Sequence, residues 1–285
     1  MIPQYDNNLL ASVFLWAEYK TLQVGQAYIN LTCRLFPTVD RSLPAGYQSY
    51  SFPIKGWNYD SGVSGALVIN SISGGGYSEP LTRASGVHFD YINGRAIVPT
   101  SLGTNLILTG TASVKQINHY QANESEEALL TQSKYFVNPR FINPLTASGA
   151  PPHIYATPAI FVNPVQMKNN AYAFGGLVDS KSTISLVVLA ESNFQLNAVL
   201  SLFRDTRYQY FPLISIDQDP LDQWGDLKSG YNYQQYITDY GTPGNLVYIE
   251  DTYTAKLSDA AKMNQQVFAG LVDLECCYIR LPPTN

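Results

Sequence analysis

The sequence predicts a mainly β protein of the α+β type, with antiparallel sheets in a sandwich, about three short helices and a long proline-rich extended arm. Two observations predict this fold. Apolar and polar residues alternate over many stretches, which is the period of a half-buried strand, whereas few stretches have the helical period. Turns rich in glycine and proline separate these stretches, so we expect more strand than helix.

The composition predicts a surface suited to protein contacts. Charged residues form 14% of the chain, below the roughly 25% of ordinary soluble domains, and tyrosine occurs 21 times. Interface cores are poor in charge because the desolvation of charges is rarely offset. They are rich in Tyr, whose ring brings a large contact area with few torsions to fix. We therefore expect a protein that assembles with other proteins.

Charge and ligand spacing argue against several other classes. The net charge of −5 lacks the basic footprint of a nucleic-acid-binding protein. No cysteine or histidine spacing matches a zinc site, and the adjacent Cys276 and Cys277 would point to opposite faces of a strand, so a disulfide framework is not expected. We predict no cofactor, no metal and no catalytic residue.

The first forty residues predict a helix followed by a strand. Asp6 or Asn7 caps a helix that starts near Leu9 and stops by Gly25. Glu18 and Lys20 interrupt its apolar stretch before it could span a bilayer, and no basic region of a secretory signal precedes it. We expect a soluble chain made in the cytosol. Alternation from Ala27 to Leu35 then predicts a half-buried strand.

A β-hairpin is the strongest local signal in the N-terminal half. Apolar residues alternate before and after Asn93-Gly94, a pair that favours a two-residue type I′ turn. The run of glycines from Gly74 to Gly76 predicts a loop, and it lacks the lysine that a phosphate-binding loop requires. We expect further strands over Tyr47 to Trp57, Ala66 to Ile72 and Asn105 to Tyr120.

The middle of the chain predicts an extended arm. A capping box at Asn123-Glu-Ser-Glu126 predicts a short helix near Ser125. Six prolines between Asn138 and Pro164 exclude helix and remove donors from a strand ladder. Large apolar side chains in this region predict that it packs on its own domain or on a neighbour, and we expect contact with at least one neighbouring subunit. The expected partner-binding residues are Phe136, Phe141, Ile142, Ile154, Tyr155 and Phe161.

The C-terminal part predicts a β-α-β unit and two long strands. A β-rich run from Thr183 to Ala190 precedes a helix that Ser192 or Asn193 caps, and a strand follows over Tyr208 to Ile216. Spacing does not decide whether these strands are parallel. Residues 217–245 read as a loop, and alternation predicts strands over 245–257 and 265–281. We expect three parts, 1–135, the arm 136–170 and 171–285, or one continuous domain.

Two local clusters carry alternative interpretations. The acidic residues of loop 217–226 have oxygen ligands suited to Ca²⁺, but Pro220 and Leu221 break the EF-hand pattern, so we favour a solvated or interface loop. The tyrosines that follow have the ring faces that stack on sugars or bases, and interface packing accounts for them equally. The clusters are Asp217, Asp219, Asp222 and Asp226, and Tyr231, Tyr233, Tyr236 and Tyr240.

The stretch from Phe174-Gly-Gly through the β-α-β unit to Asp226-Leu-Lys-Ser-Gly230, preceded by the Asn-Pro-rich arm, resembles virion proteins of tailed bacteriophages. The resemblance is to neck components of the connector, collar, head-completion or tail-terminator type. It implies a homo-oligomeric ring of six or twelve copies between the portal-side and tail proteins, through which DNA passes without specific binding. It also implies a virion protein assembled in the bacterial cytoplasm, with no membrane contact.

Three alternatives remain open. The first is another virion component, such as a decoration or minor capsid protein. The second is a receptor-binding or carbohydrate-binding β module, favoured if tyrosines converge in one groove. The third is a hydrolase, which requires His88, His119 or His153 to meet an acid and a nucleophile.

Overall fold

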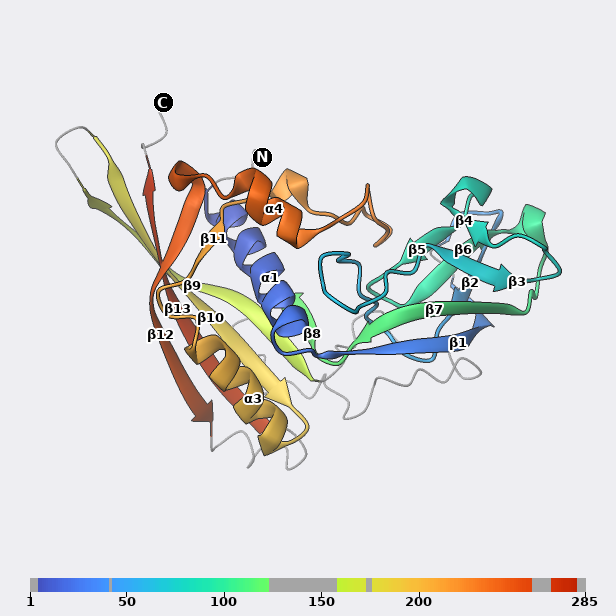
Figure 1. The fold of residues 1–285 in the computed structure, drawn as a ribbon, viewed down its shortest axis with the longest axis horizontal. Helices are drawn as coiled ribbons and strands as arrows, with labels where there is room; N and C mark the ends of the chain where they lie inside the picture. Colours follow the sequence, from blue (N-terminus) through green and yellow to red (C-terminus); the bar gives the residue numbers. More distant parts are fainter. Residues whose placement is uncertain (1–4, 41–42, 123–157, 173–175, 258–267, 281–285) are drawn as a thin grey trace.

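The structure is a computed structural model, and it describes residues 5–40, 43–122, 158–172, 176–257 and 268–280. As the sequence predicts, the fold is mainly β, with antiparallel sheets. The described residues contain three α-helices, α1 (Tyr5–Gln23), α3 (Asn193–Arg204) and α4 (Tyr233–Tyr240). Two sheets form lobes at opposite ends of the long axis (Figure 1).

The first sheet has seven antiparallel strands in the order β4-β3-β7-β1-β2-β6-β5. Its centre is the long pair of β1 and β7, and its edges are the short strands β4 and β5. Their bounds are β1 Tyr28–Thr38, β2 Tyr47–Ser51, β3 Ser71–Gly74, β4 Leu81–Thr82, β5 His88–Asp90, β6 Arg95–Pro99 and β7 Leu108–Lys115.

The second sheet has six strands in the order β11-β12-β13-β10-β9-β8. Neighbours are antiparallel except β8 and β9, which are parallel. Since β12 and β13 lie between β10 and β11, the two strands that flank α3 are antiparallel to each other. The bounds are β8 Asn118–Gln121, β9 Ala159–Ala171, β10 Val178–Ala190, β11 Tyr210–Pro212, β12 Leu246–Leu257 and β13 Phe268–Arg280.

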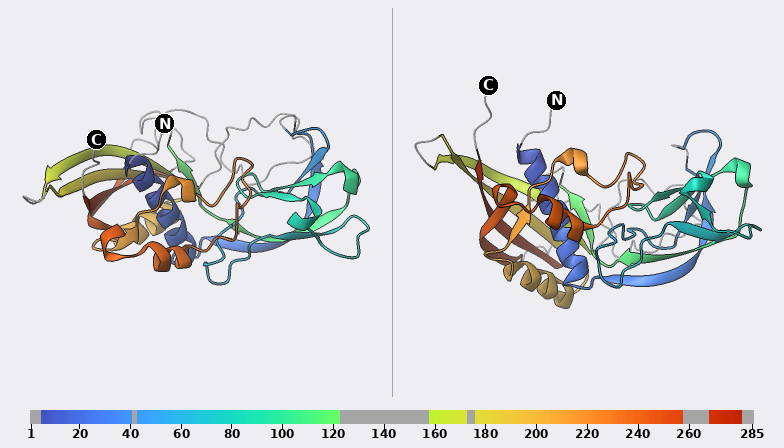
Figure 2. Two further views of the ribbon diagram at one scale, coloured as in Figure 1. Left: turned by 90° about the horizontal axis from the view of Figure 1, so that it is seen from above. Right: turned by 45° about the horizontal axis from the view of Figure 1, so that its top comes forward.

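The N-terminal helix packs on the C-terminal sheet. Trp16 of α1 lies with its ring centroid 5.3 Å from that of Phe211 and 5.9 Å from that of Phe203 of α3. Both α1 and β8 therefore belong with the second sheet, although they precede residue 135 in the chain (Figure 2). One buried apolar cluster includes side chains of both sheets, so the two lobes form one continuous unit.

The hairpin at Asn93-Gly94 exists, but its turn is not the expected type I′. Asp90 of β5 pairs with Arg95 of β6, so the loop has four residues, and Gly94 is the only one of them with a positive φ. The Asp90 carboxylate accepts hydrogen bonds from the backbone N–H of Asn93 at 2.9 Å and from its side-chain amide at 2.8 Å. These bonds stabilise the longer loop.

Part of the expected arm is a strand. Of the expected arm 136–170, residues 159–170 belong to β9 and pair with β10, with a bulge at Val165 that follows Pro164. Among the described residues, β8 pairs with β9 up to Val162, so Pro164, which lacks an N–H, lies just beyond this ladder and next to the bulge, a position where proline is tolerated. The expected single strand over Asn105 to Tyr120 is also divided, between β7 and β8.

Replacing the indole that joins α1 to the second sheet is expected to destabilise the whole fold. Trp16→Ala leaves a cavity between α1, α3 and β11, and we expect a loss of about 3–5 kcal/mol in the free energy of unfolding, measured by urea titration. Val24→Ala, at an exposed position just after the same helix, is the control and is expected to change stability by less than about 0.5 kcal/mol. Similar losses for both variants would contradict this account.

Candidate functional site

A buried polar cluster joins α1 to the first sheet. The Glu18 carboxylate accepts a hydrogen bond from the Tyr59 hydroxyl at 2.5 Å and forms an ion pair with the Lys115 ammonium. The Lys115 nitrogen also lies 4.2 Å from the centroid of the Tyr59 ring. Burial lowers the pKa of Lys115 to about 7, and the Glu18 carboxylate in contact with it favours the charged form. The cluster ties three separate elements together.

His119 lies next to this cluster but is poorly suited to catalysis. Its Nε2 is 3.1 Å from the Thr21 hydroxyl, which also donates to the Ala17 carbonyl at 2.8 Å. Burial, with a smaller effect of the Lys115 charge, lowers the pKa of His119 to about 3, so the ring is neutral at physiological pH. Its Nδ1 has no hydrogen-bond partner among the described residues, so no carboxylate orients the ring.

A cavity of about 310 Å³ opens beside the cluster, between α1, β8 and the loop 217–226. Glu18, Tyr59, Lys115 and His119 all line it. The carboxylate and the ammonium in its wall are already paired with each other, and no serine or cysteine is among the lining residues. The described residues therefore do not assemble the nucleophile, base and acid of a hydrolase here.

The acidic loop is held by its own side chains and by the first sheet. Buried Asp226 accepts two hydrogen bonds from the Arg83 guanidinium, at 2.6 and 3.0 Å. Asp222 accepts hydrogen bonds from the backbone N–H of Trp224 at 2.7 Å and of Asp226 at 3.1 Å. Within the described part of the chain, no three His, Cys, Asp or Glu side chains are placed to hold a metal ion. The loop carboxylates shape the loop instead.

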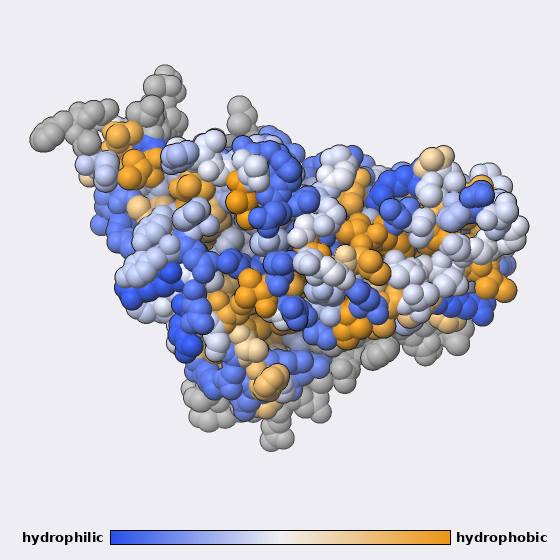
Figure 3. Space-filling view, viewed as in Figure 1, coloured by the Kyte–Doolittle hydropathy of each residue, from blue (hydrophilic) through white to orange (hydrophobic). Residues whose placement is uncertain are grey.

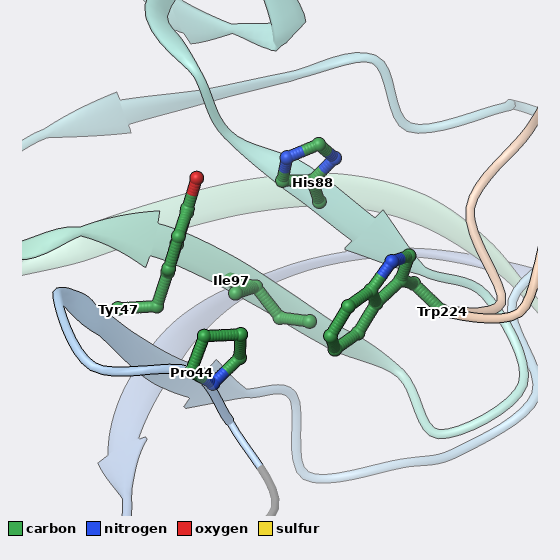
Figure 4. A pocket seen from close by; sticks show the side chains of 5 residues that line it. All are labelled: Pro44, Tyr47, His88, Ile97 and Trp224. Atoms are coloured by element: carbon green, nitrogen blue, oxygen red, sulfur yellow. The ribbon is translucent and has the colours of Figure 1, made fainter.

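This loop places Trp224 beside the first sheet, where it forms one wall of a pocket of about 230 Å³ (Figure 4). We call this the aromatic pocket, and its lining residues are Pro44, Tyr47, His88, Ile97 and Trp224. Tyr47, His88 and Ile97 come from β2, β5 and β6, and Trp224 lies at the opposite end of the row in the close-up. The rings of Tyr47 and His88 are 6.1 Å apart. The pocket walls are mainly apolar.

A second exposed aromatic group lies at the edge of the second sheet. We call it the tyrosine surface, and it consists of Tyr208, Tyr210, Tyr248 and Tyr253. Tyr208 and Tyr248 are stacked with centroids 6.3 Å apart, and Tyr210 of β11 pairs with Tyr248 of β12. By contrast, Tyr231 and Tyr233 are buried in the core, so the tyrosines singled out from the sequence do not form an exposed groove.

The exposed surface as a whole mixes apolar and polar residues. On the face shown in Figure 3, hydrophobic residues are visible over both lobes, with hydrophilic residues between them. Within the described residues, no helix is both long and apolar enough to cross a membrane.

The expected partner-binding residues are only partly described. Phe161 lies in β9 and is fully buried in its own chain, where its ring is 5.4 Å from that of Tyr120 and packs with Val187 and Leu189. Its side chain therefore serves the second sheet and is not exposed to a partner. Phe136, Phe141, Ile142, Ile154 and Tyr155 lie outside the described residues, as does His153.

Sequence reasoning missed the two exposed aromatic groups. Tyr208 and Tyr210 show the alternation that puts both on one face of a strand, which is a usable signal. The contact of these tyrosines with Tyr248 depends on the pairing of β11 with β12. The position of Trp224 near His88 depends on the contact of loop 217–226 with the first sheet. Neither contact has a local sequence signal.

Comparison with protein-family models, with curated proteins and with solved structures found no significant match to this chain.

The buried carboxylate of Asp60 is expected to make stability fall as the pH rises. Burial raises its pKa to about 6, although the backbone N–H groups of Tyr233 and Gly62 donate to it. Because its unfolded pKa is about 3.9, the folded state binds more protons between pH 4 and 6, and stability decreases through this window. In Asp60→Asn this loss, about 3 kcal/mol, is expected to be absent.

Urea titrations at pH 4.5 and 7.5 on the wild type and the variant test this expectation, since all other titrating groups are common to both and about 2 kcal/mol of the loss falls between these two pH values. Asp217→Asn, at an exposed position, is the matched control. If Asp60→Asn had the same pH dependence as the wild type, the Asp60 carboxyl would not be the group responsible.

A double-mutant cycle measures the tie between α1 and β7. Glu18→Gln leaves Lys115 buried without an anionic partner and is expected to cost about 3–5 kcal/mol of unfolding free energy. Adding Lys115→Met is expected to recover part of that loss, which gives a coupling of at least about 1 kcal/mol. The exposed pair of Lys181 and Glu250 is the control, with a coupling of about 0–1 kcal/mol. Equal couplings for the two pairs would contradict a structural role for the buried one.

Proposed function

We propose that this protein is a structural subunit of a tailed-phage virion that forms a homo-oligomeric ring in the neck and acts by protein–protein contact without chemistry. Six or twelve copies are expected from the resemblance of the sequence to neck components. The portal-side and tail proteins are its expected neighbours.

The observation that carries this proposal is the presence of two different exposed aromatic groups on the two lobes. The aromatic pocket lies on the first sheet and the tyrosine surface on the edge of the second. A contact between two unlike patches is heterologous, and repetition of a heterologous contact closes a ring when the rotation allows it. Exposed Tyr and Trp are the side chains that most often dominate such contacts.

The electrostatic balance supports a passage for DNA. With 17 Lys and Arg against 22 Asp and Glu, the chain has no excess of the basic residues that bind phosphates through counterion release. A weakly repulsive wall lets a polyanion slide, whereas a basic wall holds it.

A second candidate function is a carbohydrate-binding module, and the stack of Tyr208 on Tyr248 favours it. Ring faces near a charged pair are suited to sugars. The guanidinium of Arg207 lies 4.6 Å from the centroid of the Tyr208 ring and pairs with Asp251 at 3.2 Å, and Asp251 also accepts a hydrogen bond from Tyr253 at 3.1 Å. In that function the tyrosine surface binds a glycan and the chain has no need of a closed ring.

Light scattering of the purified full chain tests the ring. We expect a mass six or twelve times the 31.5 kDa of one chain. The double variant Tyr210→Ser and Tyr248→Ser is expected to lower the mass to that of one or two copies, because it removes the centre of the tyrosine surface. Phe194→Ser, at an exposed position on α3, is the matched control.

A wild-type mass of one copy at micromolar concentration would contradict the ring, and glycan binding lost in the double variant would favour the second candidate. Imaging of the virion is decisive for location. This chain on the capsid exterior or at a fibre tip would refute the neck. A hydrolytic activity abolished by changing one histidine would refute a role without chemistry.

A further inference from the structure

We propose that the aromatic pocket of each subunit receives the proline-rich segment, residues 136–157, of a second copy of this chain. This inference rests on the proposed ring and names the contact through which one subunit holds the next. The segment contributes Pro139, Pro144, Pro151 and Pro152, and with them Phe136, Phe141, Ile142, Ile154 and Tyr155.

The pocket has the chemistry that recognises proline. Proline-rich segments bind to grooves lined by aromatic rings, because a pyrrolidine ring packs flat on a Trp or Tyr face and the segment has little conformational freedom left to lose. Here Tyr47 and Trp224 supply the rings, and Pro44 and Ile97 complete an apolar floor. The volume of about 230 Å³ is suited to one or two side chains rather than to a folded element.

The pocket is also formed in advance. Trp224 is positioned by the hydrogen bond of its backbone N–H to the Asp222 carboxylate. His88 lies with its Nδ1 3.4 Å from the buried Asp226 carboxylate, which Arg83 holds in turn. Because these anchors already hold the pocket walls in place, binding costs little ordering of the receptor.

The connection between β8 and β9 is longer than their parallel pairing requires. Parallel neighbours need a return crossover of a dozen or so residues, and residues 122–158 are roughly three times as many. Connections longer than about 12–15 residues are uncommon in compact domains and usually serve a function or act as linkers. An extended stretch of about ten residues spans about 33 Å, which is enough to reach the surface of an adjoining subunit.

Among the described residues, the rings of the aromatic pocket are left exposed. Trp224 is 40% exposed and Tyr47 37% exposed. Exposed aromatic rings in a pocket are suited to a partner, and in the proposed ring the adjoining copy supplies one. Since every copy in a ring has both the segment and the pocket, each subunit both gives and receives one such contact.

Photo-crosslinking in the full-length oligomer tests the proposal. A photoreactive p-benzoylphenylalanine in place of Trp224 is expected to give covalent dimers on a denaturing gel, and mass spectrometry is expected to map the crosslink to residues 136–157. The same group in place of Phe194 on α3 is the matched control and is expected to give no crosslink to that segment. Crosslinks within single chains, crosslinks to other residues, or no crosslink at Trp224 would each overturn the proposal.

A second variant tests the role of proline without touching the pocket. Changing Pro139, Pro144, Pro151 and Pro152 to Ala is expected to lower the yield of the covalent dimer at least tenfold, and an unchanged yield would overturn recognition through proline. Light scattering separates this proposal from the ring itself. A ring without the crosslink refutes the docking alone, whereas the crosslink in a particle of two copies supports the docking and refutes the ring.

Discussion

The packing of α1 on the second sheet is the contact on which the rest of the molecule depends. The indole of Trp16 lies against Phe203 and Phe211, and from the same helix Glu18 reaches Lys115 at the end of β7. A single helix therefore contributes apolar packing to one lobe and an ion pair to the other. Because the pair is buried, it specifies one arrangement of the lobes, since any other leaves a charge without its partner.

Because the chain has few charged residues, each buried ion pair has a definite structural role. Arg83 and Asp226 join the first sheet to loop 217–226, and Arg95 joins Asp90 of the hairpin. The first pair fixes loop 217–226, and with it Trp224, to the turn that follows β4, and the second pair joins the facing residues of β5 and β6. Much of the remaining surface is formed by tyrosine and neutral polar groups, which are less costly to desolvate when two surfaces meet.

Elements with a local pattern could be predicted, and contacts between distant residues could not. The alternation along β13 and the Ser192 cap of α3, whose hydroxyl accepts from Gln195 N–H at 3.2 Å, identify those elements from sequence alone. The prediction of a loop over residues 217–245 is wrong where α4 lies, because the stripe of this helix is made of tyrosines and not of aliphatic residues, although the Asn232 cap is a usable signal. The aromatic pocket joins β2, β5, β6 and a loop far along the chain, and no local pattern encodes that meeting.

The two aromatic groups and the long β8–β9 connection have a common consequence for assembly. A flat patch alone gives weak orientation, because it allows sliding. A pocket that takes a segment tethered at both ends fixes the neighbour's position, and the tether raises the effective concentration of the segment once the tyrosine surface has engaged. In the ring that we propose, two modest contacts of different kinds would orient neighbouring subunits more readily than one large apolar interface, which would expose the free subunit to aggregation before assembly.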